Sequence, residues 1–491
     1  MSETNKMNQE VNVGELFQNI FKKNWDMEFI FDGINDVTLS YKEFFSRVLS
    51  YKEKLVKIGL KRQDVICLLL PNSIELVILY FAGLLMNLKV VPIDPEKGSS
   101  DIREILSHLD YKVIISNEQS FDSTQKNIFI NEFIDIKYKI IEKKESDLFN
   151  KVNFDEIYLI TFTSGSTGVP KGVMHSFNNL VKSAIAFNDK FDFDSKNVFY
   201  HNLPMTYMAG ILNLLILPII AGSKIVLGKR FNISNIAEFW DVPIRYSVNT
   251  FWFIPTILEI LLKLDRNPKG LQYTKSNKII GCVCTSPLNP STKDEFEKKY
   301  SISLYESYGL SETLFVTTNF PNSDKSGSVG KILNDAEMSF LEDNEIAIKV
   351  PWMFLGYHGI KENQFLKNRW FSSGDIGYLS ENKFCVITGR KKDLIIKGGI
   401  NISPKKIEDF IKNYHSTEVV ILGFANKFMG EKTVCFFVPN VEFDQKQINK
   451  KIVEELGKSY HIDQFIELKK IPKNLNGKVD KPKIRETYEQ N

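Results

Sequence analysis

The sequence predicts an α/β protein with at least two domains. Its 491 residues are too many for one ordinary hydrophobic core. Up to Ser116, apolar runs of strand length alternate with helical patterns, an order typical of a largely parallel sheet covered by helices. Short strands and helices alternate again in the last part of the chain, which indicates a second, smaller α+β unit.

The individual elements follow from capping residues and from apolar periodicity. Ser40 and Glu43 predict a helix start, because each side chain can accept a hydrogen bond from the other's backbone N–H group. Apolar runs and helical spacing predict the rest. Strands are expected at 65–70, 89–93, 113–116, 157–160, 198–203, 419–422 and 434–438, and helices at 74–86, 102–109, 178–187, 211–220, 404–412 and 446–456.

The composition is that of a soluble globular protein. Hydrophobic residues make up 43% of the chain and charged residues 25%. The net charge of +3 implies no strong polyanion partner, so we expect no nucleic acid. The sequence is mildly basic from Lys391 onward, which suits either an acidic ligand or an ordinary solvated surface. The most apolar window, 67–86, contains Pro71, Asn72 and Glu75, which argues against a membrane span.

The first ten residues are polar and charged and resemble neither a signal peptide nor a transit peptide. The five cysteines are scattered along the chain, which suggests a reducing compartment and a cytoplasmic location. Cys282 and Cys284 alone do not favour a metal site, because no second Cys/His pair lies near them.

One loop carries the strongest chemical signal. It follows the strand at 157–160 and holds glycines, hydroxyls and a lysine. Glycines let the backbone approach a ligand closely, hydroxyls and N–H groups donate to anionic oxygens, and a lysine adds positive charge. This combination suits a triphosphate, and the candidate binding residues are Thr163, Ser164, Gly165, Ser166, Thr167, Gly168 and Lys171.

The P-loop of nucleotide triphosphatases is excluded as an explanation of this loop. That motif places its lysine directly after its second glycine and follows it with Ser or Thr. Here Lys171 comes six residues after Gly165, is preceded by Pro170 and is followed by Gly172. A flexible surface turn is the remaining alternative.

The run T-S-G-S-T-G-V-P-K-G at 163–172 resembles the signature of AMP-forming, acyl-activating synthetases, which include acyl-CoA synthetases, adenylation domains and luciferases. The resemblance covers nearly the whole chain. It implies a large N-terminal domain, 1–389, of stacked mixed and parallel sheets covered by helices. It also implies a small mobile α+β lid domain, 390–491.

The nucleotide site implied by this resemblance lies in three downstream motifs. In Y-G-L-S-E, Tyr308 would stack on adenine, Gly309 and Ser311 would contact the nucleotide, and Glu312 would bind the Mg²⁺ that bridges the ATP phosphates. Asp375 would accept hydrogen bonds from the ribose hydroxyls. Arg390 would contact ribose and phosphate.

The resemblance also assigns the moving parts. Lys392 would be the hinge, and Gly398 and Gly399 would swing toward the incoming thiol. Lys478, in N-G-K-V-D, would bridge the carboxylate and the α-phosphate as charge develops there. The expected catalytic residues are Lys478, Thr167 and Glu312.

The acyl pocket would be lined by Tyr207, Met208, Trp252, Thr285 and Ser286. Amino-acid-activating relatives carry an aspartate where this chain has Met208. A buried ammonium without a carboxylate would be costly, so we expect an acid without an α-amino group. Cys284 and Thr285 replace glycines of relatives and should narrow the pocket, which favours an apolar, medium-sized or aromatic acid. The pocket residues could also be plain core residues, and for Trp252 the two alternatives stay open.

The sequence therefore predicts an ATP-dependent enzyme that converts a small carboxylic acid to an acyl-adenylate and transfers the acyl group to a thiol, with release of AMP and pyrophosphate. The expected cofactors are ATP, Mg²⁺ and CoA. The alternative acceptor is the phosphopantetheine of a separate acyl or peptidyl carrier protein, acting in trans. Two further alternatives are a non-catalytic nucleotide-binding relative, which the presence of Lys478, Glu312 and Asp375 disfavours, and a luciferase-like monooxygenase.

Overall fold

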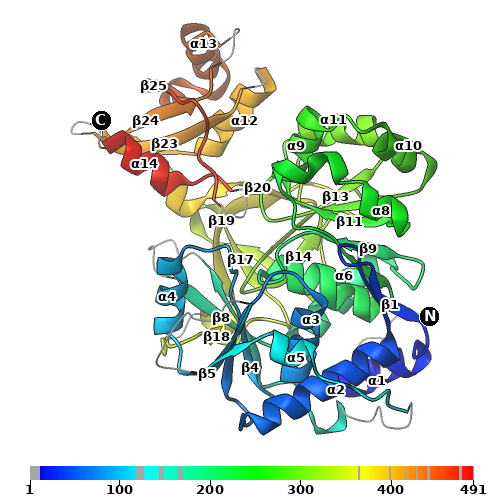
Figure 1. Ribbon diagram of the computed structural model, residues 1–491. Helices are drawn as coiled ribbons and strands as arrows, with labels where there is room; N and C mark the ends of the chain where they lie inside the picture. Colours follow the sequence, from blue (N-terminus) through cyan, green and yellow to red (C-terminus); the bar gives the residue numbers. More distant parts are fainter. Residues whose placement is uncertain are drawn as a thin grey trace, which may run out of the picture.

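The computed structural model describes residues 12–117, 126–142, 149–163, 170–362, 365–397, 400–414, 417–426, 429–439, 443–474 and 478–489. Within these ranges the strands form four sheets, of nine, seven, four and five strands. The helices cover the sheets, and the elements after β20 form a separate lobe at the upper left of Figure 1. The prediction of an α/β protein with mixed and parallel sheets is confirmed.

The two large sheets make up most of the molecule. In spatial order the first contains β15 (Lys331–Ile332), β14 (Leu314–Thr318), β13 (Ser303–Leu310), β12 (Ile280–Val283), β11 (Thr250–Phe253), β9 (Val198–His201), β10 (Lys224–Leu227), β1 (Glu28–Asp32) and β2 (Val37–Ser40). The second contains β18 (Gly356–Tyr357), β8 (Lys171–Ser176), β7 (Ile157–Thr163), β4 (Lys89–Pro92), β3 (Val65–Leu69), β5 (Tyr111–Ser116) and β6 (Lys126–Phe129). One buried cluster contains residues of both sheets, so the sheets share a core.

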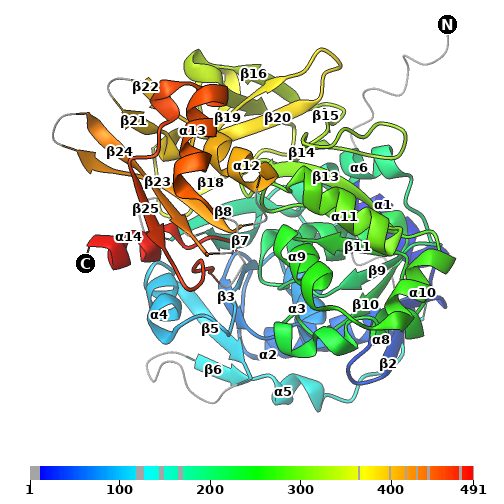
Figure 2. The ribbon, with the colours of Figure 1, turned by 90° about the horizontal axis from the view of Figure 1, so that it is seen from above.

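The two smaller sheets follow in the chain. The four-stranded sheet contains β16 (Glu337–Phe340), β17 (Glu345–Lys349), β19 (Phe371–Leu379) and β20 (Cys385–Arg390). The five-stranded sheet contains β22 (Ile400–Ile402), β21 (Ile395–Lys397), β24 (Gly430–Phe437), β23 (Val419–Asn426) and β25 (Gln464–Glu467), which pairs with β24. Figure 2 shows the five-stranded sheet and its helices beside the larger part of the molecule.

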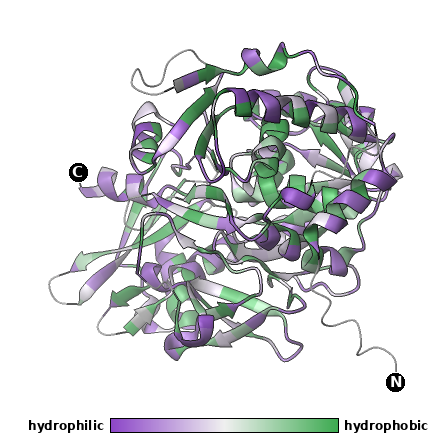
Figure 3. Cartoon of the chain, turned by 90° about the horizontal axis from the view of Figure 1, so that it is seen from below, coloured by the Kyte–Doolittle hydropathy of each residue, from purple (hydrophilic) through white to green (hydrophobic). Residues whose placement is uncertain are grey.

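The helices fill the space between and around the sheets. They are α1 (Val13–Lys23), α2 (Tyr41–Lys57), α3 (Ile74–Leu85), α4 (Ser99–Ser107), α5 (Asn131–Ile134), α6 (Phe177–Phe191), α7 (Leu217–Ala221), α8 (Asp241–Arg245), α9 (Pro255–Leu264), α10 (Pro268–Ser276), α11 (Pro290–Tyr300), α12 (Pro404–Tyr414), α13 (Gln445–Leu456) and α14 (Lys481–Glu489). Figure 3 shows apolar stretches in the interior of the molecule and hydrophilic stretches on many outer helices. Across the described part of the chain, no helix has the length and apolarity that a membrane span requires.

Several local predictions are confirmed. The capping box of Ser40 and Glu43 is formed, with the Ser40 backbone N–H donating to a Glu43 carboxylate oxygen at 2.8 Å. The helix at 74–86 is α3, in which every residue but Glu75 is buried.

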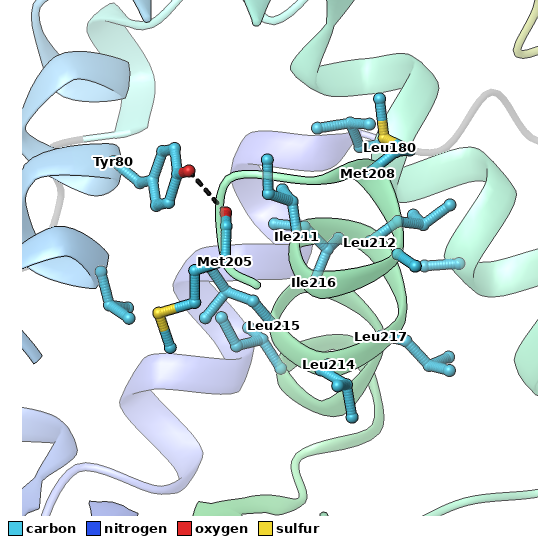
Figure 4. Packing of buried hydrophobic residues seen from close by; sticks show 14 of the residues in the cluster. Tyr80, Leu180, Met205, Met208, Ile211, Leu212, Leu214, Leu215, Ile216 and Leu217 are labelled. Carbon is cyan, nitrogen blue, oxygen red and sulfur yellow. Dashed lines mark hydrogen bonds between the residues drawn. The ribbon is translucent and has the colours of Figure 1, made fainter. Parts of the chain in front are cut away.

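The apolar stretch after Pro204 differs from the predicted α-helix. It forms a π-helix, η2 (Ala209–Ile216), that continues as α7. A Cβ at Gly210 would lie 2.0 Å from the Pro204 carbonyl oxygen, so the turn before η2 requires glycine there. The Tyr80 hydroxyl donates to the Met205 carbonyl at 2.8 Å and fixes this turn against α3 (Figure 4). Such π-helical turns are rare and frequently lie at functional sites.

The C-terminal sheet buries apolar side chains on both faces. Alternate residues of β23 face opposite sides, as strand geometry requires. Val419 and Ile421 pack toward α12 and α13, and Val420 and Leu422 pack toward α14. Side chains of this lobe reach β20 through hydrogen bonds, from Ser403 Oγ to the Thr388 carbonyl at 2.8 Å and from Lys405 Nζ to the Ile387 carbonyl at 2.6 Å. The predicted boundary between 389 and 390 falls inside β20 and stays a prediction.

Candidate nucleotide and acyl site

The strands on either side of the predicted phosphate loop form a hairpin. β7 and β8 are antiparallel, and Thr163, the last residue of β7, is paired with Lys171, the first of β8. The loop is therefore anchored at both ends by the seven-stranded sheet. The residues predicted to hold the phosphates between these ends, Ser164, Gly165, Ser166, Thr167 and Gly168, lie outside the described residues.

Lys171 and the predicted magnesium ligand, Glu312, both contact Tyr357. Lys171 Nζ is 5.2 Å from the centroid of the Tyr357 ring. The Tyr357 hydroxyl donates to Glu312 Oε1 at 2.7 Å. β18, which carries Tyr357, pairs with β8 and so brings the two elements together. Burial, followed by the nearby Glu312 carboxylate, raises the pKa of the Tyr357 hydroxyl, so this group is a neutral donor.

The segment that carries Tyr308 and Glu312 is held in place by tight packing. It forms the hairpin between β13 and β14, and a Cβ at Gly309 would lie 1.7 Å from the Leu314 carbonyl oxygen. Only glycine fits there without a shift of the backbone. The Ser311 carbonyl accepts a hydrogen bond from His175 Nε2 of β8 at 2.6 Å. Burial lowers the pKa of His175 to about 4, so the ring is neutral and one nitrogen carries the proton.

The predicted adenosine-binding residues form one hydrogen-bonded cluster. Asp375 of β19 is 3% exposed and accepts from the Tyr308 hydroxyl at 2.8 Å and from Arg390 Nε at 2.8 Å. Asp375 and Arg390 are direct partners in the β19–β20 register. Two donors leave the carboxylate with further lone pairs, so Asp375 can still accept from a diol.

Lys478 reaches this cluster from the C-terminal lobe. Burial lowers the pKa of its ammonium, and the Arg390 guanidinium acts in the same direction. Cys284 and Asp375 are close enough to oppose that shift. The structure therefore brings Lys478 together with Asp375 and Arg390, although it lies far from both of them in the sequence. Its backbone is fixed by a hydrogen bond from the Lys478 N–H to Asn474 Oδ1 at 3.0 Å.

The predicted hinge lies at the surface between the two parts of the molecule. Lys392 is exposed in the short 3₁₀ turn η6 (Lys391–Asp393), directly after β20. The next residue, Asp393, forms an ion pair with Lys481 at 2.7 Å, and Lys481 begins α14. The residues expected near the thiol, Gly398 and Gly399, lie outside the described residues.

On the predicted acyl side, Tyr207 lies within electrostatic reach of Glu312, and Cys284 within that of Lys478. Tyr207 and Cys284 are half-buried, and their side chains are close enough to influence each other. Burial, followed by Cys284 and Glu312, raises the pKa of Tyr207 to about 12, so its hydroxyl is neutral. Thr285 is half-buried with a φ of 76°, a left-handed conformation that a β-branched residue rarely adopts. Ser286 is exposed.

Met208 and Trp252 lie deeper in the molecule than their predicted neighbours. Met208 is 6% exposed and packs in the buried cluster beside η2 (Figure 4). Trp252 is 1% exposed, with its ring centroid 5.6 Å from that of Phe315 and 5.4 Å from that of Phe187. These contacts favour the core alternative for Trp252, although its indole N–H has no hydrogen-bond partner among the described residues.

Three residues near the site were not predicted from the sequence. Tyr357 and His175 position Glu312 and Ser311 through single hydrogen bonds, and no motif in the sequence marks either residue. Asn213 is a buried polar residue in the apolar helix η2, and this interruption of the apolar run is a signal that could have been used.

The described residues contain no group of three or more His, Cys, Asp and Glu side chains that could hold a metal ion on its own. This does not conflict with the predicted Mg²⁺, because Mg²⁺ is usually bound by one or two carboxylates together with substrate phosphates. Glu312, which like Lys171 contacts Tyr357, fits that pattern.

The fold and this site define a ligase of the nucleotide-binding, acid-activating class. The chain belongs to the family of AMP-binding enzymes, whose family model matches residues 17–358. The resemblance stated from the motifs is therefore confirmed.

Named relatives are similar over nearly their whole lengths. The chain is 29% identical to the 2-succinylbenzoate–CoA ligase of Listeria monocytogenes over 469 residues, which are 94% of this chain and 96% of that protein. It is 24% identical over 511 residues to 4-coumarate–CoA ligase 1 of Narcissus pseudonarcissus, covering 96% and 92%. Both of these relatives are CoA ligases.

Solved structures share the fold. ATP-bound MatB from Rhodopseudomonas palustris matches with a TM-score of 0.84 at 22% identity, covering 97% of this chain and 99% of that one. The o-succinylbenzoate CoA synthetase of Bacillus subtilis, in complex with its acyl-adenylate intermediate, matches with a TM-score of 0.82 at 23% identity, covering 96% and 97%. At these identities the comparison shows the two-domain fold.

Proposed function

We propose that this protein is an ATP-dependent, AMP-forming acid–CoA ligase that acts on a carboxylic acid without an α-amino group, most simply an aromatic one. The carrying observation is the cluster in which Asp375 accepts from Tyr308 and Arg390, with Lys478 of the C-terminal lobe within electrostatic reach of Asp375 and Arg390. The relatives named for 2-succinylbenzoate and 4-coumarate support an aromatic acid.

The proposed reaction has two steps. An oxygen of the substrate carboxylate attacks the α-phosphorus of ATP, and the bond to the β-phosphate breaks, which gives acyl-adenylate and pyrophosphate. The thiol sulfur of CoA then attacks the acyl carbon, loses its proton and displaces AMP. The mixed anhydride divides one difficult acylation into two easier steps.

The side chains have separate tasks in this scheme. Asp375 holds the ribose hydroxyls while Arg390 and Tyr308 keep its carboxylate oriented. Lys478 offsets the negative charge that develops between the carboxylate and the α-phosphate. Lys171 and the loop that precedes it bind the β- and γ-phosphates. Glu312 would hold Mg²⁺, which neutralises phosphate charge when bound.

The remaining assignments are also proposals. Residues 1–389 would bind ATP and acid, and residues 390–491 would form a lid that turns about Lys392 and brings Gly398 and Gly399 toward the thiol. A carrier-protein phosphopantetheine remains the second candidate acceptor, because the mildly basic sequence after Lys391 suits either acidic thiol carrier. A cytoplasmic location is proposed from the free, scattered cysteines.

The proposal is tested by pyrophosphate release across a panel of free acids, with and without CoA. Acid-dependent release that CoA accelerates, with formation of a thioester, is the expected result. Release that CoA does not accelerate, with no acyl-CoA formed, would indicate that a carrier protein, and not CoA, is the acyl acceptor. Release driven best by an α-amino acid would contradict the proposed substrate class.

The Tyr357→Phe variant should raise the KM for Mg-ATP by about 10- to 100-fold, because a hydrogen bond to a charged group contributes about 1.5–3 kcal/mol. The variant removes the donor that orients Glu312 and leaves the ring beside Lys171. The magnesium dependence of pyrophosphate release measures this effect. Tyr378→Phe, at a half-exposed position of β19, is the matched control and should leave the KM unchanged.

The Thr285→Gly variant should widen the range of acids that are accepted. Glycine adopts the φ of 76° without strain and removes a side chain from the predicted pocket. We expect kcat/KM for acids with a bulkier ring to rise by about 10-fold, the equivalent of about 1.4 kcal/mol. The melting temperature should change little, because relief of strain and the added freedom of the unfolded chain oppose each other. Unchanged kcat/KM values across the acids would show that Thr285 does not line the acyl pocket.

A further inference from the structure

Asn213 is a polar residue in the middle of a buried apolar helix. It is 4% exposed, and its neighbours in η2 are leucines. A buried amide is costly unless its N–H and carbonyl groups find hydrogen-bond partners. Among the described residues, its side-chain hydrogen bond runs from Asn213 Nδ2 to Cys284 Sγ at 3.6 Å. A thiol sulfur is a weak acceptor, so most of the hydrogen-bonding capacity of the amide remains for another partner.

Cys284 connects Asn213 to the reacting end of the site. Its side chain is half-buried, and it lies close enough to Lys478 and Tyr207 to influence both. Burial raises the pKa of the Cys284 thiol to about 12 against the opposing effect of Lys478, so the thiol is neutral. The hydrogen bond to Cys284 therefore links Asn213 to a residue within electrostatic reach of Lys478 and Tyr207.

β11, the strand next to β12, carries a buried donor in Trp252. Trp252 is paired with Cys282 in the parallel register of β11 and β12, so both side chains point to one face of the sheet. By alternation along the chain, Cys284 continues on that face. The Trp252 indole N–H is buried and has no hydrogen-bond partner within the described ranges.

The polar groups on this side of the site are all neutral. They comprise an amide, a thiol, an indole N–H and, nearer the reacting centre, the Tyr207 phenol. Neutral donors can pair with a hydroxyl or carbonyl oxygen of the substrate. A second carboxylate on the substrate would need a positive charge beside it if it were buried there.

We propose that Asn213 is a specificity-determining residue. It selects substrate acids that carry a neutral hydrogen-bonding oxygen, either a hydroxyl or a carbonyl, at the end of the acid opposite its reacting carboxylate. This inference rests on the proposed function and refines its substrate class from aromatic acids to oxygen-substituted ones. A site built to bond a substrate oxygen rejects the analogue that lacks it, because its own polar groups are then left unpaired.

The test compares acids that differ by one oxygen. Cinnamate is paired with 4-hydroxycinnamate, and 4-phenylbutanoate with 4-oxo-4-phenylbutanoate, and pyrophosphate release gives kcat/KM for each acid. We expect the wild-type enzyme to prefer the oxygenated member of at least one pair by about 10-fold or more, as one buried hydrogen bond allows. Asn213→Leu should reduce that ratio to about 3-fold or less, because kcat/KM for the oxygenated acid falls.

The Cys284→Ala variant distinguishes a purely structural role of Asn213 from a direct hydrogen bond between Asn213 and the substrate. If Asn213 only tethers Cys284, both variants should alter the ratio equally. If Asn213 bonds the substrate, Cys284→Ala should keep the preference for the oxygenated acid. Asn213→Ser, which retains a polar group of smaller size, replaces Asn213→Leu if the leucine variant does not fold.

The outcomes separate this inference from the proposed function. Acid-dependent release with equal kcat/KM for both members of both pairs would overturn the role of Asn213 and leave the ligase activity standing. Retention of the wild-type ratio by Asn213→Leu would overturn that role in the same way. Absence of release with every acid would overturn the ligase activity and the role of Asn213 with it.

Discussion

Replacement of Lys478 by alanine should nearly abolish adenylate formation while ATP still binds. Lys478 lies within electrostatic reach of Asp375, Arg390 and Cys284, and its proposed task is to offset the charge that develops between the carboxylate and the α-phosphate. Loss of one group that stabilises such charge typically lowers kcat by about 100- to 1,000-fold. Acid-dependent pyrophosphate release measures the loss, and equilibrium binding of ATP should change by less than about threefold.

The matched control for this prediction is Lys470→Ala, which removes an exposed lysine from the same lobe. It should release pyrophosphate at the wild-type rate. Lys478→Arg keeps the positive charge but changes its shape and reach, so we expect only partial recovery. Pyrophosphate release by Lys478→Ala at a rate comparable to wild type would contradict the catalytic role of Lys478.

Substitution of Asp375 by asparagine should raise the KM for ATP by about 100-fold. The carboxylate accepts from Arg390 Nε and from the Tyr308 hydroxyl, and it would accept from both ribose hydroxyls. Hydrogen bonds to a charged group contribute about 1.5–3 kcal/mol each, so loss of two ribose contacts corresponds to at least about 3 kcal/mol. ATP-dependent pyrophosphate release at saturating acid gives the KM.

Asp343→Asn is the matched control for Asp375→Asn. Asp343 is exposed and has a φ of 66°, a conformation that asparagine tolerates well. Its KM for ATP should stay at the wild-type value. Because Asp375 is buried, the melting temperature of each variant is measured beside the kinetics. A stable Asp375→Asn variant with an unchanged KM would contradict the ribose-binding role.

Local patterns predicted the first strands and helices of the chain correctly, and family motifs predicted the main residues of the adenosine cluster. The capping pattern at Ser40 located the start of α2, and apolar runs located β3, α3 and β4 to within about two residues. These features depend on short-range chemistry that the sequence displays directly. The motif residues Tyr308, Asp375 and Arg390 were likewise chosen from sequence, and the structure places them in one hydrogen-bonded cluster.

Other features depend on contacts between distant segments. Tyr357 reaches Glu312 because β18 pairs with β8, a pairing so short that no periodicity reveals it. His175 supports Ser311 across two different sheets. The π-helical form of η2 and the close approach of Gly210 to Pro204 are features of packing that helical spacing alone does not report.

The way in which the C-terminal lobe contacts the rest of the molecule has a thermodynamic consequence. The buried clusters on the two faces of its sheet contain only its own residues, and hydrogen bonds and ion pairs join it to the large part. These contacts are the hydrogen bonds of Ser403 and Lys405 to β20 and the ion pairs Lys473–Glu259 and Lys263–Glu418. Reorientation of the lobe would therefore exchange polar contacts for water and expose little apolar surface. Its heat-capacity change should be close to zero, and the balance between orientations should respond to ionic strength more strongly than to temperature.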